Sequence, residues 1–171
     1  MRFSRCARSF DLWSLHKLDW QPFLSGLASE DQWTTISEGT KPGEWHVTEP
    51  GSAPKASDEG GLLSAEDNSI QNLALLLAPN RISMSTFYML LAEARRAVMA
   101  DGLLVVITKD LPNGLLERIN DIWCRTIQGD AQSLDPEHYV SPEHWKLIKR
   151  ERHHARCLPL VRAAFRRTTF T

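Results

Sequence analysis

The sequence is poor in cysteine and has no long apolar run. Only three cysteines occur among 171 residues, at Cys6, Cys124 and Cys157. An odd count without regular spacing argues against a disulfide framework or a zinc module, and it favours free thiols in a reducing compartment. No stretch reaches the roughly 18 apolar residues that a membrane-spanning helix needs. We therefore predict a soluble protein with no membrane partner.

The first ten residues, MRFSRCARSF, lack the apolar core of a secretory signal. They carry three arginines and two serines but no acidic residue, which is typical of mitochondrial presequences and also of ordinary basic N-termini. The predicted location is the cytoplasm, with the mitochondrial matrix as the alternative.

The chain also lacks a marked net charge, since its formal charge is −1, and this argues against nucleic acid as the main partner. The charges are nevertheless unevenly placed. Residues 26–67 hold nine acidic residues and two lysines, whereas Lys146 to Arg167 holds eight Lys or Arg and one Glu. This basic segment is a candidate site for an acidic protein partner, although most such segments are simply solvated helix faces.

At 171 residues and 42% hydrophobic side chains, the chain is long enough for one domain and too short for two of usual size. We predict a single domain over residues 1–171. Residues 1–30 should form an N-terminal helical cover, with the helix interrupted near Pro22. Residues 50–61, rich in Pro, Gly and Ser, should form a flexible surface loop.

Four segments have the pattern of strands. Residues 32–37 and 44–49 are short and rich in β-branched and aromatic residues. Residues 69–78 are mostly apolar and residues 103–107 are apolar throughout, as expected of strands buried on both faces. Between the last two, residues 86–100 have apolar side chains at helical spacing, ending in a tight turn at Asp101 and Gly102. A strand–helix–strand unit of this kind predicts parallel pairing.

Two further helices are predicted towards the C-terminus. From Pro112 to Gly129, an apolar stripe indicates a helix that is buried on one side. A second helix should begin at Ser141, with Pro142 at its first position and Glu143 near its positive end. The predicted fold class is therefore α/β: a single Rossmann-like three-layer domain with a mostly parallel sheet and an abbreviated N-terminal half.

Two stretches carry a resemblance to a known family. "DEGGLLSAEDNSIQNLALLLAP" at 58–79 and "LAEARRAVMADGLLVVI" at 91–107 resemble the second half of a class I S-adenosylmethionine-dependent methyltransferase. The resemblance implies S-adenosylmethionine as cofactor, bound across the carboxyl ends of parallel strands. It implies that Asp58 meets the adenine amino group, that Glu38 and Gly39 lie in the first cofactor-binding turn, and that Glu49 stands in for the ribose-binding acid.

The sequence departs from the family at that first turn. "ISEGTKPGEW" at 36–45 lacks the glycine-rich run that lets the backbone approach a ligand closely. The connection is also too short for the helix that parallel strands require. The alternative is that the two strands around it form an antiparallel hairpin.

The histidines suggest two further roles. His138, beside Tyr139, has the residue type of a general base for methyl transfer, and an exposed polar position is the alternative. His138, His144, His153 and His154 together with Cys157 raise the question of zinc, but their spacing fits no zinc module. No metal site and no catalytic residue is therefore assigned.

Two classes of function remain. In the first, the protein binds S-adenosylmethionine and methylates a small-molecule substrate by holding it in line with the methyl group. In the second, it is a catalytically inactive binding or scaffolding subunit that acts through its basic C-terminal region. The missing glycine-rich turn favours the second class.

Overall fold

A computed structural model gives the fold of this chain. It describes residues 20–29, 32–38, 45–52, 55–57, 65–77, 83–115, 117–119, 122, 133–155 and 158–168.

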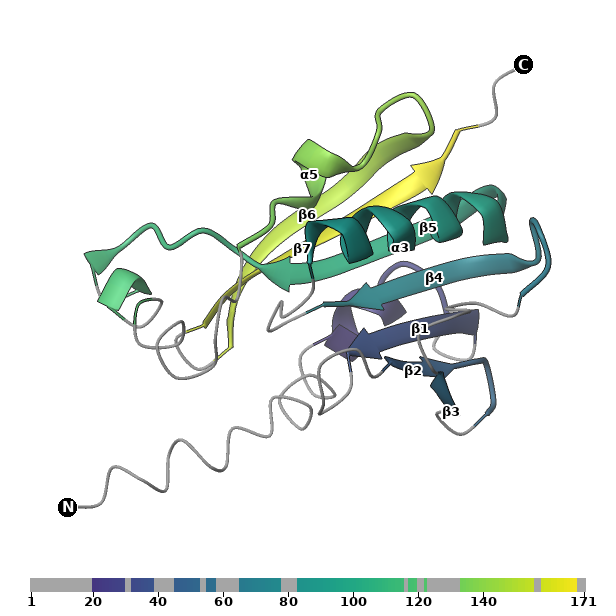
Figure 1. The fold of residues 1–171 in the computed structure, drawn as a ribbon, viewed down its shortest axis with the longest axis horizontal. Coiled ribbons are helices and arrows are strands. Elements are labelled where there is room, and N and C mark those ends of the chain that lie inside the picture. The colour runs from purple at the N-terminus through teal and green to yellow at the C-terminus, as the bar shows by residue number, and fades with distance from the viewer. Residues whose placement is uncertain are drawn as a thin grey trace.

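The described residues form one seven-stranded sheet with the order β3-β2-β1-β4-β5-β7-β6 (Figure 1). Two labelled helices accompany it, α3 (Met84–Ala97) and α5 (Pro136–Tyr139). The strands are β1 (Trp33–Glu38), β2 (Trp45–Thr48), β3 (Lys55–Ser57), β4 (Ile70–Leu76), β5 (Val98–Lys109), β6 (Trp145–Ala155) and β7 (Leu158–Arg167).

The sheet is mixed rather than mostly parallel. β4 pairs in parallel with β1 and with β5, whereas β1–β2, β2–β3, β5–β7 and β6–β7 are antiparallel. Four of these six described pairings are antiparallel, so the prediction of a mostly parallel sheet is wrong. The predicted parallel unit of strand, helix and strand is confirmed as β4–α3–β5, and the alternative of a hairpin between the first two strands is confirmed as β1–β2.

α3 covers one face of the sheet, which we call the front face. The Ser83 hydroxyl caps the helix by accepting a hydrogen bond from the Thr86 N–H. Its buried residues recur at helical spacing and pack with β4 and β5 in the larger of two apolar clusters: Phe87, Leu90, Ala94 and Ala97. The prediction placed the end of this helix at residue 100. It ends instead at Ala97, and β5 begins at the next residue.

The early start of β5 creates a bulge. Ile70 pairs with Val98, but Asn72 pairs with Leu103, so β5 contains extra residues that β4 does not match. Asp101 has a positive φ of 62°, and Gly102 follows it. The predicted turn at these two residues is therefore a bulge inside one long strand.

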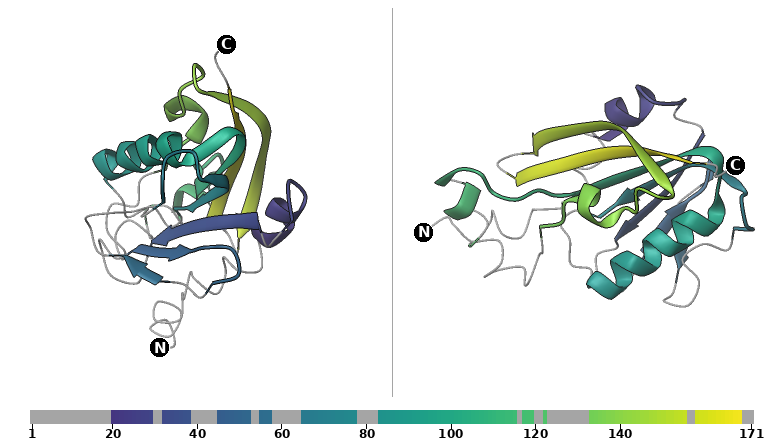
Figure 2. Two further views of the ribbon diagram at one scale, coloured as in Figure 1. Left: turned by 90° about the vertical axis from the view of Figure 1, so that its right-hand side faces the viewer. Right: turned by 90° about the horizontal axis from the view of Figure 1, so that it is seen from above.

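The back face carries the N-terminal cover. Residues 20–25 are helical, Pro22 included, and Phe23 and Leu24 are buried there against side chains of β1, β4 and β5. Figure 2 shows this short helix and α3 on opposite sides of the sheet. With one long helix on the front and a short one on the back, the described residues are rich in sheet and do not show a full three-layer arrangement.

Two other segments differ from their predictions. Residues 55–57 of the expected loop form β3. The expected helix from Ser141 is a single turn, closed by hydrogen bonds from the His144 and Trp145 N–H groups to the Ser141 carbonyl, and β6 follows it. β6 pairs with β7 along nearly its whole length, which satisfies the backbone groups on the outer edge of β7.

The stripe expected to be buried after Pro112 is exposed where it is described. The side chains of Leu115, Ile119 and Ile122 are 75%, 56% and 65% exposed. Leu116, Trp123 and Ile127 lie outside the described residues. Within the described part, no helix is both long enough and apolar enough to span a bilayer.

Candidate functional site

The three parallel strands end together at one end of the sheet, which we call the carboxyl edge. Ser37 of β1 pairs with Leu76 of β4, and Leu76 pairs with Ile107 of β5. In open α/β sheets, ligands bind outside the carboxyl ends of the strands. This edge is where the residues predicted to bind a cofactor should meet.

The register of β1 and β2 separates two of those residues. Glu38 is opposite Trp45, and Thr35 is opposite Thr48, so β2 runs away from the carboxyl edge. Glu49 follows Thr48 and lies about 13 Å along the strand from Glu38, at a rise of about 3.3 Å per residue. The structure therefore does not bring Glu38 and Glu49 together.

β3 returns to the carboxyl edge. It is antiparallel to β2, and its last residue, Ser57, is opposite Trp45, which is itself opposite Glu38. The chain therefore leaves β3 at the same end of the sheet as β1. Asp58 and Gly39 themselves lie outside the described residues.

A network of charged side chains lies after the end of β5, and the sequence did not point to it. Nε of Arg152 is 2.7 Å from Oδ2 of Asp110, and its Nη2 is 2.9 Å from Oε2 of Glu117. Nε2 of His154 is 2.7 Å from Oε1 of Glu117. A hydrogen bond from the Asn113 N–H, then the His154 bond and the Arg152 charge, lower the pKa of Glu117 to about 2.

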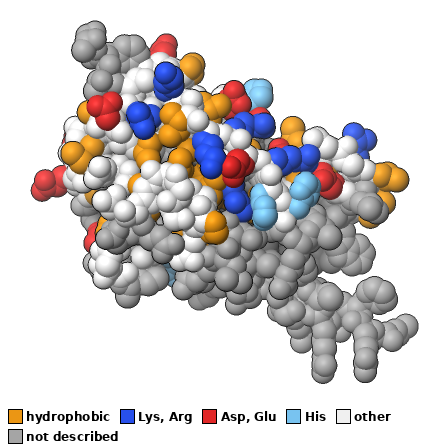
Figure 3. All heavy atoms as spheres, turned by 180° about the vertical axis from the view of Figure 1, so that it is seen from behind, with side chains coloured by type: hydrophobic (Ala, Val, Ile, Leu, Met, Phe, Trp, Pro, Cys, Tyr) orange, Lys and Arg blue, Asp and Glu red, His pale blue; other side chains and the backbone are white. Residues whose placement is uncertain are grey.

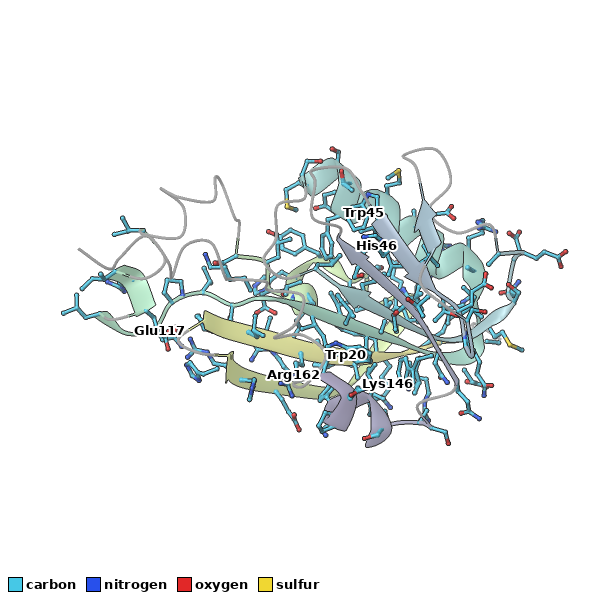
Figure 4. All side chains as sticks on the ribbon, turned by 90° about the horizontal axis from the view of Figure 1, so that it is seen from below. Trp20, Trp45, His46, Glu117, Lys146 and Arg162 are labelled. Atoms are coloured by element: carbon cyan, nitrogen blue, oxygen red, sulfur yellow. The ribbon has the colours of Figure 1, made fainter. Side chains whose placement is uncertain are left out.

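This network joins the segment after β5 to the edge strand β6. Both oxygens of Glu117 are engaged, and Arg152 also donates a hydrogen bond to the Leu111 carbonyl at 3.0 Å. Figure 4 shows Glu117 well away from Trp45 and His46. Because these contacts join Asp110 and Glu117 to Arg152 and His154 of β6, we interpret the network as a tether that holds the segment after β5 on β6.

The basic segment Lys146 to Arg167 forms the β6–β7 hairpin, and most of its described cations have partners within the chain. On the front face, Arg150 is 3.2 Å from Oδ2 of Asp135, and Arg152 belongs to the tether. Arg167 donates hydrogen bonds to the Asn68 side chain at 2.6 Å and to the Val98 carbonyl. Arg156 lies outside the described residues.

The back face of the hairpin contains four more cations. Lys149 is 2.9 Å from Oε1 of Glu151, and its Nζ lies 4.9 Å from the centre of the Phe23 ring. Arg162 is buried and lies 5.9 Å from the same ring centre. Lys146 and Arg166 are exposed. Figure 3, seen from behind, shows Lys and Arg side chains in a band across the molecule, with acidic and His side chains among them.

The described histidines do not form a cluster that could bind a metal ion. Nδ1 of His138 is 3.5 Å from Oδ2 of Asp135, and its side chain is exposed. The neighbouring Tyr139 packs its ring against Phe87, with the ring centres 5.8 Å apart. Among the residues that the structure describes, no three His, Cys, Asp or Glu side chains are placed to hold a metal ion. Cys157 lies outside them.

Comparison with known proteins does not assign this chain to a family. No family model matches the chain, and no curated protein matches it. Among solved structures, the crystal structure of MccD protein aligns with 62% of this chain at 13% identity and a TM-score of 0.45. A possible exported protein from Bordetella parapertussis aligns with 61% at 17% identity and a TM-score of 0.44.

A third solved structure is CrArsM, an arsenic (III) S-adenosylmethionine methyltransferase from Chlamydomonas reinhardtii. It aligns with 62% of this chain at 14% identity and a TM-score of 0.37. The alignments span 64%, 41% and 40% of the three chains, less than two thirds of each. Structural similarities as partial as these do not support any conclusion about function.

Proposed function

We propose that this chain is a binding or scaffolding subunit with a methyltransferase-like sheet, which acts through its basic β6–β7 hairpin and does not use S-adenosylmethionine. The antiparallel register of β1 and β2 carries this proposal. In the family that the sequence resembles, the ribose-binding acid follows the second strand at the carboxyl edge. Here the second strand is reversed, and Glu49 follows it at the other end of the sheet.

The length of the β1–β2 connection supports the same conclusion. Only residues 39–44 join Glu38 to Trp45, whereas a crossover between parallel strands takes a dozen residues or more. A helix beginning directly after β1 would offer free backbone N–H groups to an anionic ligand. A connection of this length has no room for such a helix, and Pro42 within it has no N–H to donate.

The hairpin supports the binding role by its charge. The segment from Lys146 to Arg167 contains eight cations and one acid, and two of its described cations, Lys146 and Arg166, are exposed and make no ion pair within the described part of the chain. A local excess of one sign raises the concentration of oppositely charged partners and steers their association. We therefore propose an acidic protein as the partner.

One observation favours a second candidate, a methyltransferase acting on a small molecule. β1, β3, β4 and β5 all run towards the carboxyl edge, so β3, which ends at Ser57, finishes at the same edge as Glu38. The resemblance implies that Asp58, the residue after Ser57 in the sequence, meets the adenine amino group. In this candidate Glu38, Gly39 and Asp58 form the cofactor site, and Glu49 does not.

Two measurements on the purified protein separate the candidates. The first is thermal unfolding with and without millimolar S-adenosylmethionine or S-adenosylhomocysteine. We expect no shift, whereas a ligand at a hundred times its Kd would add about 2.7 kcal/mol of stability. A shift that disappears in Asp58→Ala would support the methyltransferase instead.

The second measurement is the fluorescence anisotropy of a labelled polyglutamate peptide titrated with the protein. We expect binding at low salt that weakens as salt is added, because exposed charges are screened. If polyglutamate does not bind at low salt, the proposed function is wrong.

A further inference from the structure

Two exposed cations of the hairpin lie directly opposite each other. Lys146 of β6 is paired with Arg166 of β7, so both side chains project from the back face. Opposite residues in an antiparallel pair have Cβ atoms about 5 Å apart, and like charges placed there repel each other. The pair therefore costs stability unless an anion lies between or above the two groups.

The rest of the hairpin shows how the chain neutralises its own cations. Arg150 and Arg152 on the front face have carboxylate partners. Glu151 is opposite Arg162 across the strands, and it is also ion-paired with Lys149. By contrast, within the described part of the chain the side chains of Lys146 and Arg166 make no ion pair and no hydrogen bond.

The described part of the N-terminal cover, residues 20–29, contacts only part of this cationic surface. Phe23 lies against Lys149 and Arg162, which are therefore partly or wholly covered. Lys146 and Arg166 lie further along the strands, and both stay exposed. Figure 4 labels Trp20, Arg162 and Lys146 in the region where the short helix meets the hairpin. The open pair is thus beside the edge of the cover.

We infer that Lys146 and Arg166 form an anion clamp that binds carboxylates of an acidic segment of a partner protein. The ammonium and the guanidinium are carried by residues whose Cβ atoms are about 5 Å apart, so both can reach closely spaced carboxylates, and the guanidinium can bind one in a bidentate manner. The inference rests on the proposed function, since it names the residues through which the hairpin would hold its partner.

The surface around the clamp favours a polypeptide over a nucleic acid. Single-stranded nucleic acids are held by aromatic side chains on which bases stack, in addition to cations. Among the described residues, the large exposed side chains include one aromatic residue, Tyr88, and it belongs to α3 on the front face. Strand addition along β6 is disfavoured too, because its register shifts between Leu147 and Lys149 and because its exposed side chains are mostly charged.

The test compares two double variants of equal charge in the polyglutamate titration. Lys146→Glu with Arg166→Glu removes the clamp, and Arg95→Glu with Arg118→Glu reverses two exposed cations elsewhere. Each pair changes the net charge by four, from −1 to −5. In the clamp variant, two glutamates lie opposite each other where two cations did. The repulsion between like charges across the strands is therefore similar in the variant and in the wild type. Thermal unfolding verifies that both variants are folded.

We expect the clamp variant to bind polyglutamate about tenfold more weakly than the control variant does, and Lys146→Arg to bind as the wild type does. Equal losses in both double variants would show an effect of net charge alone and would overturn the clamp. If wild type binds the peptide and the clamp variant binds equally well, the clamp is wrong while the proposed function stands. Tighter binding of an oligothymidine than of polyglutamate, lost in the clamp variant, would overturn the choice of partner.

Discussion

Nε2 of His154 lies 2.7 Å from Oε1 of Glu117, although 37 residues separate the two in the chain. The contact joins the segment after β5 to the edge strand β6, and Arg152 strengthens it from the same strand. Leu115 and Ile119, on either side of Glu117, have exposed side chains. Among the described residues of this segment, polar contacts rather than buried apolar side chains therefore join it to β6.

The first prediction is a dependence of stability on pH through Glu117. Its pKa is lowered from 4.5 to about 2. A carboxyl whose pKa is lower in the folded state stabilises the fold above its unfolded pKa, and this stabilisation is lost as the pH falls through the folded pKa. Urea unfolding should therefore show wild type more stable than Glu117→Gln above pH 4.5, with the difference vanishing towards pH 2. A difference that stays constant over this range would contradict the tether.

The second prediction concerns the packing of α3. Phe87 is fully buried and packs edge-on against Tyr139, whereas its neighbour Tyr88 is 53% exposed. Phe87→Ala should lower the free energy of unfolding by about 3 to 5 kcal/mol, because it leaves a cavity in the core. Tyr88→Ala should cost less than about 1 kcal/mol. Denaturant titration of both variants measures the contrast, and similar losses would mean that α3 presents another side to the sheet.

The unit β4–α3–β5 could be predicted from sequence because its signals are local. A buried strand reads as one apolar run, and an amphipathic helix reads as apolar residues at helical spacing. The β1–β2 hairpin could be predicted from a local signal too, because the connection between the two strands is too short for a crossover.

The C-terminal hairpin could not be predicted in this way. Ser141, Pro142 and Glu143 have the chemistry of a helix start, and they do form one turn. Whether a helix continues from that turn depends on β7, whose outer edge needs a strand partner, and this is a contact between distant segments. The tether has the same origin, because Glu117 and Arg152 lie 35 residues apart.

The third prediction follows from the bulge in β5. A Cβ atom on Gly102 would lie 2.6 Å from the carbonyl oxygen of Gln71 and 2.9 Å from that of Met99. Backbone atoms cannot move aside as a flexible side chain can, so Gly102→Ala should cost about 1 to 3 kcal/mol in the free energy of unfolding. Gly114→Ala is the matched control, since nothing lies within 4 Å of its added atom, and it should change stability by less than about 0.5 kcal/mol.

The last prediction separates two arginines of β7 that look alike in the sequence. Arg162 is 7% exposed, lies against Phe23 and is opposite Glu151, whereas Arg166 is exposed and is opposite Lys146. Arg162→Glu would bury a carboxylate against an aromatic ring and opposite a second carboxylate. A carboxylate at a position that is 7% exposed and opposite a second carboxylate should lower the free energy of unfolding by about 3 kcal/mol or more.

Arg166→Glu should not destabilise the fold, because it replaces the repulsion between Arg166 and Lys146 with an attraction between Glu and Lys146. Its free energy of unfolding should stay within about 0.5 kcal/mol of the wild type or rise slightly. Urea unfolding of the two single variants under the same conditions tests both expectations. If Arg166→Glu destabilises the fold as strongly as Arg162→Glu, then Arg166 is bound within the protein and is not available to a partner.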